Sequence, residues 1–255
     1  MPAYFITGTD TGIGKTRTSC AFVHALRNGG HARVVGMKPV AAGCDWVPGT
    51  DGHPGQWLNE DIAALRAASS LHVPSSFDNP YALSDAVSPH IAARNAGERI
   101  DLAHIEASFH ALSQHADAVV VEGAGGFIVP LHEPALADAS GDPGEWLTSA
   151  DLAQRLALPV ILVVGLRLGC LNHALLTQEA VVSRGLTLAG WVANVVDPAM
   201  PEQAAYVTSK GAVMQLGRGL AVDWGRHGIR VNVVAPGVID TPLNARSFAD
   251  PARIA

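Results

Sequence analysis

The 255-residue sequence is poor in cysteine, aromatic residues and charge. It contains 3 cysteines, 5% aromatic residues and 16% charged residues. Cys20, Cys44 and Cys170 are odd in number and match no metal-binding spacing, which argues against a disulfide scaffold and against a thiolate metal centre. We therefore expect three reduced thiols that pack as small hydrophobic side chains.

The sequence also lacks a basic cluster and a long apolar run. Its 17 Lys and Arg residues are scattered and outnumbered by 23 Asp and Glu residues, which argues against nucleic-acid binding. No segment approaches the roughly 18 consecutive apolar residues of a membrane-spanning helix. No secretory leader is recognisable at the start of the chain. We expect a cytoplasmic protein that binds neither nucleic acid nor membrane.

Hydrophobic residues (48%) and glycine (26 residues) are abundant, so the chain can bury a large core. Apolar strand-like runs that end in glycine or polar residues alternate with helical segments. This alternation predicts an α/β protein with a doubly wound, mostly parallel sheet and a P-loop NTPase-like architecture. Helices are expected at 17–28, 58–68, 91–95, 101–114 and 150–156, strands at 33–37, 118–121, 159–164 and 188–192, and a loop at 44–56.

Residues 4–18 predict a buried strand, a glycine-rich loop and the opening of a helix. Backbone N–H groups in such a loop bind anions at the positive end of the helix dipole. Gly14-Lys15-Thr16 is typical of a Walker A loop, in which lysine reaches the outer phosphates and the hydroxyl binds Mg²⁺. However, Gly8 and Gly14 enclose five residues rather than four, and residues 7–14 also fit a dinucleotide-binding turn. The loop alone leaves ATP and NAD(P) open.

Three charged residues lie near the ends of other predicted elements. Lys38 follows the second strand, Glu122 follows a central strand, and Asp61 lies in the first turn of a helix. Ligand groups of α/β proteins gather at the carboxyl ends of parallel strands. Lys38 would supply positive charge, whereas both carboxylates and Thr16 would supply the hard oxygens that Mg²⁺ prefers. The helix dipole alone also explains an acidic residue such as Asp61.

Seven motifs follow one another along residues 1–198. In order and spacing they resemble the dethiobiotin synthetase family, the ATP-dependent ligases that close the ureido ring in biotin synthesis, and that family also has the five-residue gap. The motifs are Gly8-Thr9-Asp10-Thr11 with Gly14-Lys15-Thr16, Lys38-Pro39-Val40-Ala41, Asn79-Pro80-Tyr81, Ser88-Pro89-His90, Val121-Glu122-Gly123-Ala124-Gly125-Gly126, Leu168-Gly169-Cys170-Leu171-Asn172-His173 and Gly190-Trp191-Val192-Ala193-Asn194.

The resemblance implies a homodimer that converts 7,8-diaminononanoate, CO₂ (or bicarbonate) and MgATP into dethiobiotin, ADP and phosphate. One substrate amine captures CO₂ as a carbamate, the carbamate oxygen attacks the γ-phosphorus, and the second amine closes the ring. Positioning and charge stabilisation would supply most of the catalysis.

The resemblance also implies roles for individual residues, and Ala42 departs from it because the family often has serine there. Catalysis would involve Lys15, Lys38 and Thr11. ATP would be bound by Gly12, Ile13, Gly14, Lys15, Thr16, Glu122, Gly125 and Asn194. The substrate would be bound by Thr11 and Lys38, with its carboxylate at the helix start formed by Gly169, Cys170, Leu171 and Asn172, in that family across a dimer interface. Mg²⁺ would be held by Thr16, Asp61 and Glu122.

From about Ala204 a second resemblance replaces the first. Residues 206–213, 228–237 and 240–242 look like the catalytic helix and following strand of a short-chain dehydrogenase/reductase, with Tyr206 as the acid and Lys210 one helical turn away. We predict an ATP-binding unit over 1–203 and an appended segment over 204–255, with a helix at about 204–224, a strand at 229–234 and a loop. This segment would replace contacts on the adenine side of the nucleotide.

Two alternative functions remain open at this point. The first is an NAD(P)-dependent reductase, although the serine expected about a dozen residues before Tyr206 is missing, because Ala193 and Asn194 occupy that region. The second is a regulatory or partitioning ATPase, which also uses a Gly-Lys-Thr loop on a parallel sheet. No distinct interaction surface for such an ATPase is recognisable in the sequence.

Overall fold

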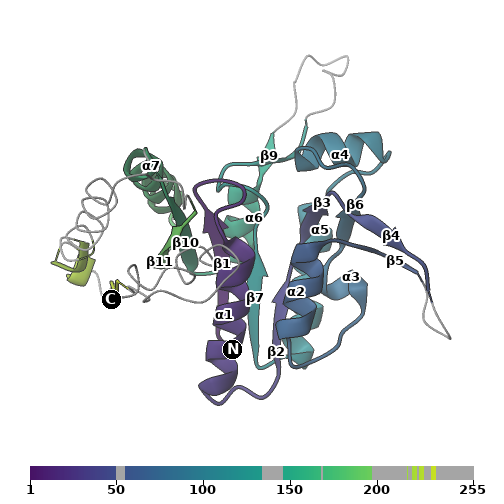
Figure 1. The fold of residues 1–255 in the computed structure, drawn as a ribbon, viewed down its shortest axis with the longest axis horizontal. Helices are drawn as coiled ribbons and strands as arrows, with labels where there is room; N and C mark the ends of the chain where they lie inside the picture. Colours follow the sequence, from purple (N-terminus) through teal and green to yellow (C-terminus); the bar gives the residue numbers. More distant parts are fainter. Residues whose placement is uncertain are drawn as a thin grey trace, which may run out of the picture.

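The computed structural model describes residues 1–49, 55–133, 146–167 and 169–196, with residues 217, 220–222, 224–226 and 231–233 of the carboxyl-terminal segment. A parallel sheet of five strands in the order β11-β10-β1-β7-β2 forms its centre (Figure 1). The strands are β1 (Ala3–Gly8), β2 (Val34–Met37), β7 (Ala118–Glu122), β10 (Val160–Leu166) and β11 (Leu188–Val195).

Helices cover both faces of this sheet. The inward side chains of one face, including Phe5 and Leu162, pack with Ile105 and Leu152 of α5 and α6. Those of the other face, including Ile6, pack with α1 and α2. The doubly wound α/β class predicted from the sequence is therefore confirmed. The helices are α1 (Lys15–Asn28), α2 (Glu60–Ala68), α3 (Ser75–Asp78), α4 (Pro89–Asn95), α5 (Leu102–His115), α6 (Ser149–Leu156) and α7 (Cys170–Ser183).

Strand register brings polar residues together at the end of the sheet where the parallel strands have their carboxyl ends. Every residue of β7 and β10 is buried, as expected for central parallel strands that are covered on both faces. Ile6 of β1 lies opposite Glu122 of β7, and Met37 of β2 lies opposite Val121. Because the three strands run in the same direction, the end of β7, the Lys38 loop and the loop after β1 meet there.

Short strand pairs lie outside the main sheet, and one of them differs from the sequence prediction. β4 (Asp45–Val47), within the expected loop 44–56, pairs antiparallel with β5 (Gln56–Leu58), which runs from the last loop residue to the first residue of the helix expected at 58–68; that helix, α2, begins at Glu60 instead. Trp46 and Trp57 lie opposite each other with ring centroids 5.5 Å apart, and such a cross-strand aromatic pair favours a strand despite the flanking Gly and Pro. The other pairs are β3 (Val40–Ala42) with β6 (Tyr81–Leu83) and β8 (Pro130–His132) with β9 (Leu147–Thr148).

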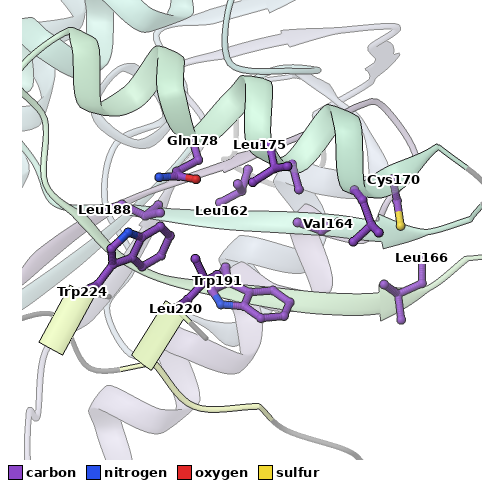
Figure 2. Close-up of a pocket in the computed structure, with 12 residues that line it drawn as sticks. Leu162, Val164, Leu166, Cys170, Leu175, Gln178, Leu188, Trp191, Leu220 and Trp224 are labelled. Carbon is purple, nitrogen blue, oxygen red and sulfur yellow. The ribbon is translucent and has the colours of Figure 1, made fainter. Parts of the chain in front are cut away.

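The described part of the carboxyl-terminal segment lies against the outer edge of the sheet. Leu220 and Trp224 line an apolar pocket together with Trp191 of β11 and side chains of β10 and α7 (Figure 2). Trp224 and Val233 are partly buried against the core. Residues 231–233, which fall in the expected strand, lie in no strand. Most of the helix expected at 204–224 lies outside the described residues.

Candidate active site

A glycine-rich loop joins β1 to α1. Gly12 and Gly14 adopt φ values of 71° and 91°, in the left-handed region that glycine enters at little cost. A Cβ atom on Gly8 would lie 2.5 Å from Ile13 Cδ1 and 3.2 Å from the Lys15 side chain, so a larger residue there would require these side chains to move. Ile13 is itself buried and anchors the loop in the core. The predicted strand, loop and helix therefore form as the sequence indicated.

The loop and the first turn of α1 present free backbone donors. In the described part of the chain, the N–H groups of residues 12–17 have no hydrogen-bond partner. Gly14 caps α1 without a side chain that could accept from these groups. Unpaired N–H groups at a helix start bind anions because the helix dipole adds to their own partial charge. This arrangement fits the phosphates of a nucleotide.

The Lys15 side chain folds back over this loop. Its Nζ donates to the carbonyl oxygen of Asp10 at 2.7 Å. Burial lowers the pKa of Lys15 to about 8, and the like charge of Lys38 adds to this effect, while the carboxylates of Glu122, Asp61 and Asp10 oppose it. The ammonium therefore stands next to the unpaired N–H groups in a poorly solvated place.

Lys38, Asp61, Glu122 and Thr16 converge beside the loop from four different elements. Lys38 Nζ lies 2.6 Å from Glu122 Oε1 and 2.8 Å from Asp61 Oδ2. The Thr16 hydroxyl contacts Asp61 Oδ1 at 2.5 Å and Glu122 Oε1 at 3.0 Å. Glu122 is fully buried, and the described residues offer no hydrogen bond to its second oxygen, Oε2.

Opposite charges favour the ionised forms of Lys38 and Asp61. Burial alone would lower the pKa of Lys38, but Glu122 and Asp61 outweigh burial and raise it. Burial likewise opposes the ionisation of Asp61, but Lys38 and the Thr16 hydroxyl outweigh it and lower the pKa of this carboxyl group. The Lys38 ammonium and the Asp61 carboxylate are thus both charged at neutral pH.

The donor set of this cluster suits Mg²⁺ rather than a softer metal. The described residues contain no group of three or more His, Cys, Asp or Glu that could hold a metal by themselves. Mg²⁺ needs fewer protein ligands, since it commonly takes one or two carboxylates and completes its shell with water and substrate phosphate. The unpaired Oε2 of Glu122 and the hydroxyl of Thr16 next to the anion-binding loop fit that requirement.

A second helix start lies close to the loop. Gly169 caps α7 with φ 89° and no side-chain bond, and the N–H groups of Leu171 and Asn172 have no partner among the described residues. Arg167, just before this turn, forms an ion pair with Asp10 of the phosphate loop. The predicted substrate-carboxylate residues therefore form a second anion-binding helix start, tethered to the first.

Three further predicted residues lie around the phosphate loop. Asn194, near the end of β11, donates from Nδ2 to the Ile13 carbonyl at 2.9 Å, and a Cβ on Gly14 would lie 2.3 Å from the same nitrogen. Thr11 is exposed, and its hydroxyl lies 3.5 Å from where a Cβ of Gly125 would stand. In the structure, the amide of Asn194 thus holds the loop itself.

Comparisons with known proteins agree with this geometry. A family model described as an AAA domain matches residues 2–218. An ATP-dependent dethiobiotin synthetase BioD of Aromatoleum aromaticum is 54% identical over 198 residues, which cover 78% of this chain and 80% of that protein. The BioD of Xanthomonas campestris pv. campestris is 43% identical over 239 residues, covering 93% of this chain and 96% of its own. The chain belongs to the dethiobiotin synthetase family.

A second family model, described as short chain dehydrogenase, matches residues 193–252. It confirms that the end of the chain resembles a dehydrogenase. This match overlaps the AAA-domain match over residues 193–218, and the 239-residue alignment with the Xanthomonas BioD also extends past Ala204. Tyr206 and Lys210, the candidate catalytic pair of that resemblance, lie outside the described residues. In the parts of the chain that can be described, no helix has the length and apolar character to cross a bilayer.

Sequence reasoning gave no role to several residues that contact this candidate site. Asp10 and Arg167 form an ion pair that links the two helix starts. The glycine turn beside each of them is the sequence feature that could have pointed to these two residues. Asn79 belongs to a motif that the sequence singled out without a chemical reason. Its side chain donates to the Lys38 carbonyl at 2.6 Å, a contact between residues far apart in sequence that no local pattern reveals.

Proposed function

We propose that the chain catalyses the ATP-dependent conversion of 7,8-diaminononanoate and CO₂ into dethiobiotin. Membership of the dethiobiotin synthetase family supports this assignment. The observation that carries it within the site is the position of Lys38 and the two carboxylates beside an anion-binding loop with Lys15 and Thr16. Carbonyl reduction by NAD(P)H does not require a lysine and two carboxylates beside the phosphate-binding loop.

The loop side of the site would hold the triphosphate of ATP. Phosphate oxygens would accept from the unpaired N–H groups of residues 12–17 and from Lys15, whose ammonium would leave the Asp10 carbonyl for a charged partner. These donors are fixed before the reaction begins. They stabilise the charge that builds up on the phosphate oxygens as the γ-phosphoryl group is transferred.

Lys38 would hold the reacting carbamate. An ammonium has three protons, and two of those on Lys38 point to Glu122 and Asp61. The third faces the Gly123 carbonyl at 3.5 Å, the outer limit of a hydrogen bond, so it remains available for a carbamate oxygen. That oxygen attacks the γ-phosphorus with loss of ADP. The second amine then attacks the carbamate carbon and expels phosphate.

Thr16, Asp61 and Glu122 would hold Mg²⁺. When bound, this ion supplies positive charge that neutralises phosphate oxygens. The substrate carboxylate would lie at the start of α7, where Leu171 and Asn172 offer N–H groups, and Thr11 would donate its hydroxyl to the substrate or a phosphate. The ion pair between Asp10 and Arg167 would hold the start of α7 against the phosphate loop of the same chain.

We further propose that the enzyme is a cytoplasmic homodimer. Residues 1–203 would form its catalytic unit, and residues 204–255 would be an appended segment that packs on this unit rather than an independent domain. Exposed leucines on α7, Leu171, Leu175 and Leu176, support an interface on this helix. The shared apolar pocket of Leu220 and Trp224 with Trp191 supports a packing role for the carboxyl-terminal segment.

Phosphate release tests the assignment. The chain is mixed with ATP and Mg²⁺, and release is compared with and without 7,8-diaminononanoate and bicarbonate. We expect release that depends on both substrates, that disappears in Lys15→Ala, and that persists in Tyr206→Phe. Binding of NADPH with no substrate-dependent phosphate release would instead support the reductase.

A further inference from the structure

The backbone of Lys38 is held on both sides by residues outside the reacting cluster. Its N–H donates to the carbonyl of Asp78 at 2.8 Å. Its carbonyl accepts from Asn79 Nδ2 at 2.6 Å, and the same nitrogen lies 3.2 Å from the Tyr81 carbonyl. Asn79 is 6% exposed, so water does not replace these bonds. The amide of Asn79 thus ties the residue directly after β2 to the start of β6.

Asp78 is itself fixed by a charged side chain. Arg66 donates from Nε and Nη2 to the two oxygens of Asp78 at 2.7 Å and 2.8 Å, a forked pair of parallel bonds. Asp78 is only 4% exposed. A two-pronged bond of this kind fixes orientation as well as distance. The carbonyl that receives the Lys38 N–H is therefore anchored to helix α2.

Helix α2 acts on both the side chain and the backbone of Lys38. Asp61, in its first turn, contacts the ammonium, while Arg66, five positions later, acts through Asp78 on the backbone amide. We propose that Arg66, Asp78 and Asn79 are positioning residues that place the Lys38 ammonium for its reaction. This inference rests on the proposed function and adds to it the residues that set the geometry of Lys38.

The physical reason is the short range of the interactions at stake. A displacement of about 1 Å in a positioning group can cost about 100-fold in rate. Replacing Asn79 by Asp keeps the shape of the side chain but removes both N–H donors, so carboxylate oxygens would face the carbonyls of Lys38 and Tyr81. Replacing Arg66 by Lys keeps the charge but removes the fork. Neither change touches the phosphate loop.

The experiment compares Asn79→Asp and Arg66→Lys with controls placed elsewhere. Arg33 also donates from Nε and Nη2 to an aspartate, although both bonds go to one oxygen, Oδ1 of Asp117, and the pair is exposed at the other end of β2. Arg33→Lys is therefore the control for replacing an arginine that bonds an aspartate away from Lys38. Asn95→Asp is the control for the amide, because Asn95 donates to Asp85 at the surface. Each variant is measured for kcat, for KM of both substrates and for calorimetric ATP binding.

We expect kcat to fall by about 10- to 100-fold in Asn79→Asp and Arg66→Lys, with ATP affinity and binding stoichiometry unchanged. The two controls keep the parental kcat. A structural defect without a positioning role would instead lower the binding stoichiometry together with kcat. Parental kcat in both test variants would overturn the inference. An inactive parent chain would refute the proposed function instead, so the two failures are distinguishable.

Discussion

Replacing Lys38 by methionine is the sharpest perturbation of the charged cluster. Methionine keeps most of the length of the side chain but removes the ammonium that lies 2.6 Å from Glu122 and 2.8 Å from Asp61. Thr16 cannot compensate for this loss, because its single hydroxyl proton serves one acceptor at a time and lies nearer Asp61. Glu122, which is fully buried, would face a second carboxylate without a cation between them.

The magnitude follows from this burial. Removing one partner of a buried ion pair costs about 3–5 kcal/mol, because the remaining charge keeps its desolvation penalty. In a chain of this size each kcal/mol lowers Tm by about 2–4 °C, so the expected decrease is about 6–20 °C. Removing the buried pair in Lys38→Met/Glu122→Leu restores most of the lost stability, since an apolar replacement of a buried pair is often close to neutral and the remaining carboxylate, Asp61, is 39% exposed to water.

The assay is urea and thermal unfolding at neutral pH in the absence of nucleotide and Mg²⁺. Tryptophan fluorescence and circular dichroism are recorded together, since coincident transitions justify two-state free energies. Lys38→Met is expected to be markedly less stable than the parent, and the double variant to recover. Parental stability in Lys38→Met, or a double variant less stable than both single variants, would refute the buried-charge reasoning.

Three further predictions concern the loop, the metal ligands and the carboxyl-terminal segment. Because the pKa of Lys15 is lowered to about 8, its ammonium is lost as pH rises through that value, and ATP affinity measured by calorimetry falls by up to about tenfold per pH unit above it; Lys15→Arg, which stays charged, should bind ATP without this pH dependence. Thr16→Val should raise the Mg²⁺ concentration for half-maximal activity by about tenfold or more, whereas Thr16→Ser retains the hydroxyl and remains close to the parent; equal shifts in both variants would contradict a ligand role. Trp224→Ala should lower the free energy of unfolding by about 1–3 kcal/mol because Trp224 is half-buried against the core, while Val222→Ala, at a site 78% exposed, should change it by less than about 0.5 kcal/mol; similar effects would argue that the segment is not packed on the sheet.

The sequence by itself determined the features that depend on neighbouring residues. Gly12 and Gly14 permit left-handed backbone, and Lys15 and Thr16 open the following helix, so the strand, loop and helix could be read locally. The alternation of apolar runs with helical segments predicted the doubly wound sheet for the same reason. The dehydrogenase-like end of the chain was also recognisable from its motifs.

Local patterns failed where a partner strand supplied the stabilisation. Composition predicted a loop between Cys44 and Gln56. Trp46 nevertheless lies in a strand, because it pairs across strands with Trp57, eleven positions later. The pocket that Trp224 and Trp191 both line has the same origin, because no local pattern in the sequence predicts that these two residues lie near each other.

The tertiary structure alone decided which side chains act together. Thr16, Lys38, Asp61 and Glu122 are separated by up to 106 positions, and they meet because parallel strands place their carboxyl ends at one edge of the sheet. The sequence marked these residues as candidates, but their mutual distances depend on strand order and register. The hydrogen bond from Asn79 to the Lys38 carbonyl also depends on the tertiary structure, since segments far apart in sequence can bond only once the sheet has set the distance between them.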